Sequence, residues 1–428
     1  MADRAPGGHA RDAGGQYPPR DLPRLYAARI SAVVCARHPC PANRRAGRGV
    51  VGASPGPARG DGFGALPVCA RPGIRARSDA GRRQYPPRAD AGAVGGLASF
   101  FLGQSARART ADRDHCRRGS VLMRFRKLGR AGLDLSELAI GVSAGDPGDT
   151  AAAIASAFDL GVNTVTICAG DREAAGLLAG TGGIRAVHVC ATATSRVPFD
   201  LPSPHVPAWQ AYPGSHLRAE AEALLGRLGI ERLALVQLPA WCPEWLHEGD
   251  WLETLVRLRD EGKIAGFGVS LFDHDLDAAL EAVASGLIDA VQLMYNIFDQ
   301  GAAAALLPLC EKHNVGVVVR SPLYYGAITP AFARTPAFPD GDWRSGYFFD
   351  EHRCETAERV RQLEGLVAPP DRSVTDMALR FCLSHPAVST VAVGMHQRMH
   401  LEANLRAIEQ GPLEADRHAA LAQHKWLC

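Results

Sequence analysis

The segment LVRLRDEGKIAGFGVSLF, residues 255–272, joins two kinds of periodicity in one unit. Its first half repeats apolar residues at helical spacing, and its second half is a short apolar run of strand length. Units of this kind recur along the chain from Met123 onward. Such alternation is typical of repeated βα units that build a parallel sheet.

Apolar runs of strand length occur eight times, and we expect strands at 138–142, 162–167, 186–193, 233–238, 265–271, 288–295, 315–320 and 389–394. Helical patterns lie between them, among others at 216–229, 251–263, 275–286, 303–313 and 374–385. Asp250 and Ser373 directly precede two of these helices and are expected to cap them, because a side-chain oxygen there accepts an unpaired amide of the first turn. The count and order predict an α/β fold, a (β/α)₈ TIM barrel over residues 123–428, with its chemistry on the loops after the strands.

Residues 1–122 differ in composition from the rest. They contain 21 Arg and 8 Asp but no Lys and no Glu, in a background rich in Gly, Pro and Ala. No sustained helical or strand period runs through them, so we expect no packed core there. Our interpretation is a low-complexity extension, either disordered or the result of a mis-assigned start codon ahead of Met123, with an organelle transit peptide as a further reading.

Charge and cysteine usage exclude several classes of protein. Residues 123–428 are acidic overall and show no basic stripe, which argues against a nucleic acid partner. The apolar cluster LASFFLG near Leu97 is far shorter than the roughly 20 residues needed to cross a bilayer. Eleven cysteines without a C-x-x-C pair indicate neither a disulfide framework nor a metal site. We expect a cytoplasmic protein without membrane contact, and its oligomeric state is left open.

Seven collinear stretches carry a family resemblance, among them MRFRKLGRAGLDLSELAIG from Met123, LLGRLGIERLALVQL from Leu224, LLPLCEKHNVGVVVRSPLYYG from Leu306 and MALRFCLSHPAVSTVAVGMHQRMHLEANLRA from Met377. In order and spacing, residues 123–411 resemble the aldo-keto reductases. The resemblance implies a (β/α)₈ barrel that transfers hydride from NADP or NAD to a carbonyl of a small-molecule substrate.

The resemblance also implies four catalytic residues, and this chain departs from all four. In the family a Tyr donates the proton, a Lys lowers its pKa, an Asp pairs with the Lys and a His orients the carbonyl, because a phenol with a pKa near ~10 is a poor acid unless a cation favours its ionised form. The Asp position holds Thr166, the Lys position holds Ala193 and the His position holds Pro239. The segment that presents Tyr is shortened to Cys168, Ala169 and Gly170. We therefore expect a non-standard active site.

Positions that contact the cofactor in the family are partly kept, namely Ser270, Gln292, Ser321, Leu323, Gly394 and Asn404. For Gln292 and Ser321, a structural role as polar residues at strand ends is as well supported by the sequence as a role in cofactor binding. Leu271 and Arg320 replace the usual Asn and stacking aromatic, and GMHQRMH, residues 394–400, offers His396, Arg398 and His400 where the family has a better placed cation for a 2′-phosphate. We expect a weak or partial site for NADP or NAD.

Other side chains near the expected barrel mouth are candidates for the missing chemistry: Tyr324 and Tyr325 as acids, Arg320 as a carbonyl- or carboxylate-binding cation, Cys168 as a nucleophile, and more remotely Asp171, Trp241, Cys242 and Tyr295. A free cysteine is more often a small buried apolar residue than a nucleophile. The leading hypothesis is an NAD(P)H-linked oxidoreductase that acts on a reactive biosynthetic carbonyl, such as a secondary metabolite or a sugar. The alternatives are a barrel that binds a ligand or partner without turnover, and a non-redox isomerase or lyase.

Overall fold

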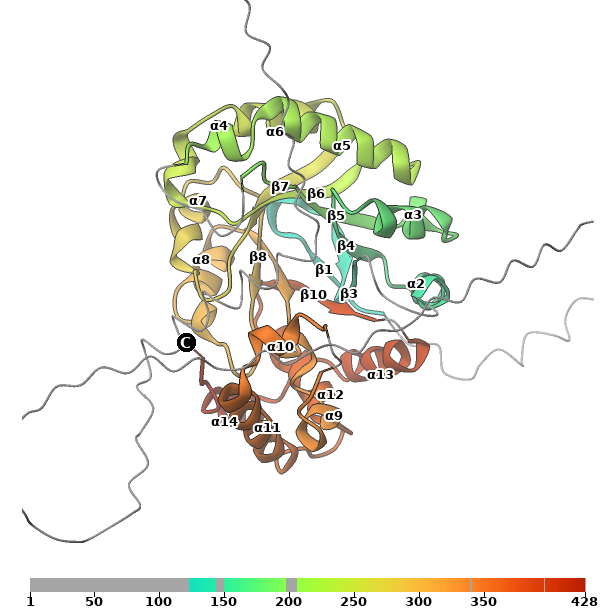
Figure 1. Cartoon of the computed structure of the whole chain (residues 1–428), viewed down its shortest axis with the longest axis vertical. Coiled ribbons are helices and arrows are strands. Elements are labelled where there is room, and N and C mark those ends of the chain that lie inside the picture. Colours follow the sequence, from blue (N-terminus) through green and yellow to red (C-terminus); the bar gives the residue numbers. More distant parts are fainter. Residues whose placement is uncertain (1–122, 144–149, 198–205, 339–340, 396, 428) are drawn as a thin grey trace, which may run out of the picture. The chain divides into compact units, whose positions relative to one another are not determined.

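The computed structural model describes residues 123–143, 150–197, 206–338, 341–395 and 397–427. Within this part of the chain, eight parallel strands close into one barrel, and helices surround it (Figure 1). The predicted (β/α)₈ barrel is confirmed. The expected extension over residues 1–122, including the cluster near Leu97, lies outside the described residues and stays a prediction.

The barrel strands follow one another around the closed sheet in chain order. They are β3 (Leu138–Val142), β4 (Thr164–Cys168), β5 (His188–Thr192), β6 (Leu233–Pro239), β7 (Ile264–Ser270), β8 (Ala290–Met294), β9 (Gly316–Arg320) and β10 (Val388–Gly394), and β10 pairs with β3 to close the barrel. All eight predicted strands are present, with ends that differ by at most two residues.

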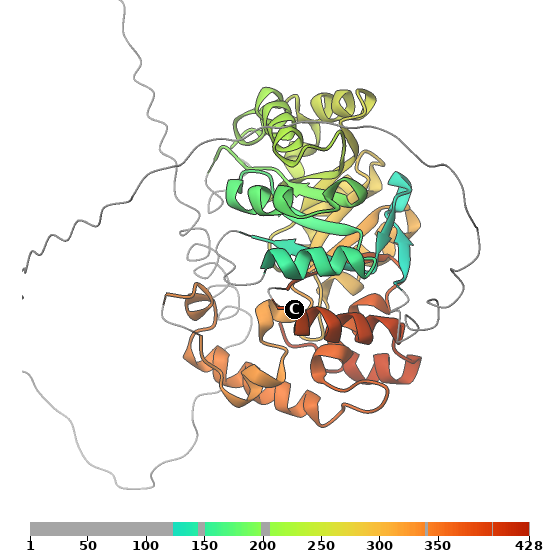
Figure 2. The same cartoon turned by 90° about the vertical axis from the view of Figure 1, so that its right-hand side faces the viewer.

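Helices follow the strands as a βα repeat requires: α2 (Thr150–Asp159), α3 (Arg172–Gly180), α4 (Ala208–Ala211), α5 (Gly214–Leu228), α6 (Trp251–Asp260), α7 (Leu280–Ala284), α8 (Leu306–Lys312), α12 (Val374–Leu383) and α13 (Arg398–Glu409). Three helices, α9 (Pro330–Arg334), α10 (Arg344–Tyr347) and α11 (Asp350–Glu364), are inserted between β9 and α12, and α14 (Ala415–Ala422) ends the described helices. The C-terminal helices α9 to α14, coloured orange to red, lie together in the lower part of both views (Figures 1 and 2).

One of the two predicted helix caps is confirmed. The side chain of Ser373 accepts the amide of Asp376 in the first turn of α12. The prediction for Asp250 is wrong, because its side chain makes no capping bond to α6. Asp250 Oδ1 instead accepts the amide of Gly214 at 2.8 Å, so the carboxylate ties the start of α5 to the start of α6.

A β-hairpin closes the amino-terminal end of the barrel. Its strands are β1 (Phe125–Lys127) and β2 (Asp134–Ser136), and Leu128 and Leu135 from it pack against barrel residues Cys190, Leu235 and Val318. The buried Glu137 pairs with Arg124 and Arg126 at 3.0 and 2.6 Å. The chain is therefore anchored to the barrel from its first described residues onward.

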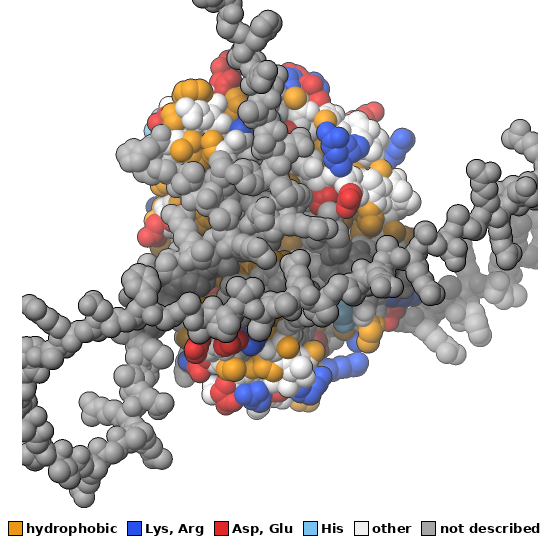
Figure 3. All heavy atoms as spheres, viewed as in Figure 1, with side chains coloured by type: hydrophobic (Ala, Val, Ile, Leu, Met, Phe, Trp, Pro, Cys, Tyr) orange, Lys and Arg blue, Asp and Glu red, His pale blue; other side chains and the backbone are white. Residues whose placement is uncertain are grey.

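The described surface has mixed charge. Figure 3 shows acidic and basic side chains interspersed over the part of that surface that is in view. None of the described helices is long and apolar enough to cross a membrane.

Candidate functional site

The barrel register fixes which side chains share a level in the sheet. Gly141, Thr166, Cys190 and Leu235 are neighbours on four successive strands, and in-register neighbours on adjacent strands face the same side. Cys190 and Leu235 belong to the apolar cluster that the hairpin plugs, so this level faces the barrel interior. Thr166 therefore lies inside the barrel, where the resemblance places a carboxylate.

The connection after β4 is short and tightly packed. Cys168 ends the strand, and Asp171 already caps α3 by accepting the amide of Ala174 at 2.9 Å. Ala169 and Gly170 alone bridge the two. A Cβ added to Gly170 would lie 2.5 Å from the hydroxyl oxygen of Thr194, so this turn has no room for a larger side chain without a shift.

The positions at which the resemblance places a Lys and a His carry no titratable side chain. Ala193 is buried and belongs to the main apolar cluster. Pro239 ends β6, and its carbonyl oxygen accepts the buried hydroxyl of Tyr212. Burial raises the pKa of that phenol, so Tyr212 stays protonated and serves to fix the strand end.

Ser270 and Gln292 meet at the ends of neighbouring strands. They are in register on β7 and β8, and the Ser270 hydroxyl donates to Gln292 Oε1 at 2.8 Å. Both residues are buried. The pair retains hydroxyl lone pairs and an amide NH₂ group, which is the donor and acceptor set that a primary carboxamide requires.

Arg320 ends β9 and is part of a charged group of three residues that we call the mouth triad, Asp273, Arg320 and Tyr325. The guanidinium forms an ion pair with the buried Asp273 and donates to the carbonyl of Leu271 at 2.7 Å. The Tyr325 hydroxyl donates to Asp273 Oδ2 at 2.6 Å and accepts from Arg320 at 3.3 Å. These contacts tie the loop after β7 to the loop after β9.

The turn after β9 has a left-handed backbone at Ser321, with a φ of 52°. The Ser321 carbonyl accepts the Asn296 side-chain amide at 3.2 Å and the Tyr324 amide at 2.9 Å. Leu323 is half-buried behind it, and its carbonyl accepts the amides of Gly326 and Ile328. The turn is thereby held in one conformation at the strand end.

The remaining cofactor candidates lie at and beyond the end of β10. Gly394 is the exposed last residue of the strand, and Asn404 is buried on α13. Arg398 is exposed and pairs with Glu402 at 2.9 Å on the same helix, while His400 is exposed and His396 lies outside the described residues. The Arg398 guanidinium thus has a carboxylate partner already.

The two adjacent tyrosines, Tyr324 and Tyr325, have different surroundings. Tyr324 is completely buried, and its hydroxyl is 3.0 Å from Nε2 of the buried His352 on α11. It packs in an aromatic cluster with Phe348 and Tyr347. Tyr325 is only half-buried and belongs to the mouth triad. Of the two candidate acids, the structure brings Tyr325 together with charged partners and places Tyr324 in the core.

The cysteine candidates have the wrong electrostatics for a nucleophile. Although the Cys168 side chain is exposed, desolvation by the surrounding mouth raises its pKa, and the carboxylates of Glu220 and Asp171 raise it further. Burial and Glu244 raise the pKa of Cys242 to about 12. Because the thiolate is the reactive form, neither thiol is activated. Trp241 and Tyr295 are buried, the latter stacked on Phe381.

Sequence reasoning missed a pair next to the mouth triad. His274, in the loop after β7, has Nδ1 2.9 Å from Asp299 Oδ2 in the turn after β8, and both side chains are almost fully buried. The two carboxylates Asp299 and Asp273 raise the pKa of His274 despite its desolvation. The run Asp273–His274 directly after a predicted strand was the available signal.

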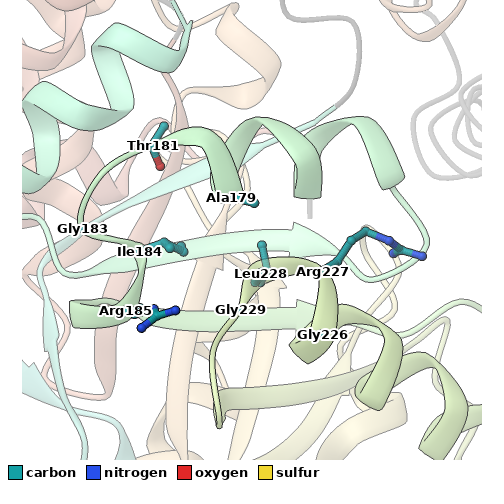
Figure 4. A pocket seen from close by; sticks show the side chains of 9 residues that line it. All are labelled: Ala179, Thr181, Gly183, Ile184, Arg185, Gly226, Arg227, Leu228 and Gly229. Carbon is teal, nitrogen blue, oxygen red and sulfur yellow. The ribbon is translucent and has the colours of Figure 1, made fainter. Parts of the chain in front are cut away.

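One hollow, of about 470 Å³, lies between the end of α3 and the end of α5, where Arg185 and Arg227 reach its edges (Figure 4). These elements lead into strand amino termini, so this hollow is at the opposite end from the candidate site. Among the described residues, no group of three or more His, Cys, Asp or Glu is placed to hold a metal ion.

Comparisons with known proteins agree with this fold. A curated relative from Bacillus subtilis, the uncharacterized oxidoreductase YqkF, is 28% identical over 309 residues, which cover 71% of this chain and 96% of the relative. The NADH-specific methylglyoxal reductase of Escherichia coli is 26% identical over 205 residues, covering 47% of this chain and 61% of the relative. Among solved structures, the holo form of an aldo-keto reductase from Bacillus halodurans superposes with a TM-score of 0.58 at 23% identity, covering 72% of this chain and 98% of that one. Residues 205–425 match the sequence profile of the aldo/keto reductase family. The chain belongs to the aldo/keto reductase family.

Proposed function

We propose that this protein is a nicotinamide-dependent oxidoreductase that reduces an electron-poor carbonyl without the usual Tyr, Lys, Asp and His of the family. The observation that carries the proposal is the hydrogen-bonded Ser270–Gln292 pair at the ends of β7 and β8. Its donors and acceptors match the carboxamide of a nicotinamide, and its buried position excludes competing water.

The other residues at this edge fit a dinucleotide. The turn at Ser321 and Leu323 follows β9, where backbone amides can meet a pyrophosphate. Gly394 ends β10 and has no side chain to obstruct a ligand there. Asn404 lies on α13, the helix that follows β10 in the chain. When bound, the cofactor supplies hydride to the substrate carbon. The protein's part is to orient the nicotinamide and to provide a proton for the carbonyl oxygen.

Proton transfer is assigned to Tyr325. Its hydroxyl proton is shared with Asp273, and Arg320 stabilises negative charge on the phenol oxygen. Asp273 opposes that charge, so Tyr325 is a weaker acid than a phenol paired with a lysine alone. A carbonyl next to a second electron-withdrawing group needs less help from an acid, because the neighbouring group already stabilises the developing alkoxide.

The substrate class follows from this argument. We assign an α-oxo-aldehyde or a similarly activated biosynthetic carbonyl, and not a simple aldehyde. One relative is named a methylglyoxal reductase, and methylglyoxal is an α-oxo-aldehyde, which supports the assignment. Little preference for NADPH over NADH is supported by the Arg398–Glu402 pair, because the two opposite charges leave no net positive charge there to attract a 2′-phosphate.

A fluorescence titration with NADH tests the carboxamide site. Gln292→Leu should weaken NADH binding by roughly two- to tenfold, the worth of about one net hydrogen bond. Thr390→Val is the matched control, because Thr390 is also a buried polar residue on a barrel strand, but on β10 and outside the pair. Equal binding by wild type and Gln292→Leu would refute the assignment of the pair.

A second candidate function is a barrel that binds a ligand or a partner without turnover. It is favoured by Thr166, Ala193 and Pro239, none of which can transfer a proton at neutral pH. The two functions differ in a simple assay. NADH binding with no consumption of NADH in the presence of methylglyoxal supports the binding barrel, whereas NADH oxidation that scales with protein concentration supports the oxidoreductase.

A further inference from the structure

His274 directly follows Asp273 of the mouth triad and has a strained backbone conformation. Its φ is 64°, a region that residues other than glycine rarely adopt and in which asparagine is better tolerated than most. Three residues separate His274 from Ser270, which contacts Gln292. A strained and buried residue so close to a binding pair is held there by its contacts, among them the ion pair with Asp299.

The charges that act on His274 come from three elements. Asp299 approaches from the turn after β8, Asp273 from its own loop and Arg320 from β9. His352, from α11, is not a competing cation, because burial and the neighbouring His274 lower its pKa to about 4. With a neutral His274, the two aspartates and one arginine leave a net negative charge. With a protonated His274, the group is neutral.

A cavity of about 180 Å³ adjoins His274, and Asp277 is also among the residues that line it.

We propose that His274 is a positioning residue that takes up a proton when a nicotinamide dinucleotide binds, and that its ion pair with Asp299 then holds the loop of Ser270 and Asp273 in the binding conformation. The inference rests on the proposed function. A dinucleotide adds the negative charge of its pyrophosphate to a group that is already negative while His274 is neutral. Protonation removes that repulsion, so the cofactor binds the protonated form more tightly and by linkage raises its population.

The sign of the pH dependence follows from the raised pKa of His274. A group whose pKa is higher in the folded protein than the ordinary 6.5 stabilises the fold fully at pH values below 6.5 and loses that contribution as the pH rises through the folded value. The affinity for NADH should fall as the pH rises beyond the folded value, by at most about tenfold per pH unit for one proton.

Calorimetry of NADH binding to the full chain tests the proposal directly. Titrations in buffers of different ionisation heat report the number of protons taken up, and NADH is the probe because the 2′-phosphate of NADPH itself titrates near pH ~6. We expect a fractional proton uptake at neutral pH in wild type. It should vanish in His274→Asn, which tolerates the left-handed backbone, and should decrease in Asp299→Asn. His418→Asn is the matched control, since His418 stacks on Phe381 away from the site, and it should keep the wild-type uptake.

The outcomes separate this inference from the proposed function. NADH binding without proton uptake, or wild-type uptake in His274→Asn, overturns the role of His274 and leaves the proposed function standing. No NADH binding at any pH overturns both. The unfolding midpoint of each unliganded variant, measured as a function of pH, adds a readout without cofactor: wild type should lose stability relative to His274→Asn as the pH rises above 6.5.

Discussion

Exchanging the two adjacent tyrosines for phenylalanine, one at a time, should have opposite consequences. Tyr325→Phe removes the hydroxyl shared with Asp273 and Arg320, and Tyr324→Phe removes the hydroxyl that contacts His352. The two changes delete the same atom from neighbouring residues. Each variant is therefore the control for the other.

The magnitudes follow from the burial of each group. Tyr324 is fully buried, so its deletion leaves the His352 ring nitrogen without its partner and costs about 1–3 kcal/mol of unfolding free energy. In a chain of this size each kcal/mol lowers Tm by roughly 2–4 °C. Tyr325 is half-buried, so its deletion affects stability less. The loss of a positioned proton donor should lower kcat by roughly 10²-fold or more.

The assay compares kcat for an α-oxo-aldehyde with NADH, and Tm from thermal unfolding, in the two variants and wild type. Tyr325→Phe should lose turnover and keep most of its Tm, whereas Tyr324→Phe should keep turnover and lose Tm. Unchanged turnover in Tyr325→Phe, or lost turnover in a well-folded Tyr324→Phe, would refute the assignment of the proton donor.

Three further predictions follow. A shortened chain that begins at Met123 should be soluble and keep the Tm of the full chain, because the hairpin and the Arg124–Glu137 pair already anchor that end; a chain that fails to fold would show that residues 1–122 are structural. NADPH should bind less than about tenfold more tightly than NADH, a difference of about 1.4 kcal/mol, and a larger ratio in calorimetry would contradict the reading of Arg398. Ala193→Lys should not raise NADPH-dependent turnover of simple aldehydes above background, since it adds a buried cation with neither Tyr nor Asp beside it; a spectrophotometric assay that shows a gain would mean that one residue restores the standard mechanism.

The fold followed from the sequence because the strand signals are strong and local. Each of the eight barrel strands is an apolar run bounded by turns, and all eight were predicted. The residues that cap helices were harder to predict: of the two predicted caps, Ser373 is confirmed and Asp250 is not. Ser373 accepts the amide three residues on, but Asp250 is drawn to Gly214, which is distant in sequence. A local rule cannot anticipate a partner that only the closed barrel brings near.

The candidate site was predictable only in part. The family resemblance identified Ser270 and Gln292 as cofactor positions, and the structure places them in register within hydrogen-bonding distance. It did not separate Tyr324 from Tyr325, because their different environments depend on α11, which is inserted later in the chain. His274 and Asp299 were missed for a similar reason. They lie on loops after different strands and meet only at the barrel end.

The most direct test of the central claim is isotopic. The full chain would be incubated with a 1,2-dicarbonyl such as methylglyoxal and with NADH that carries deuterium at the transferable position of the nicotinamide, using each of the two labelled faces in turn. Mass spectrometry of the product should find one deuterium in the alcohol for one face and none for the other, in an amount that scales with protein. NADH that binds to the protein while no deuterium reaches the product from either face would contradict the claim that this barrel transfers hydride.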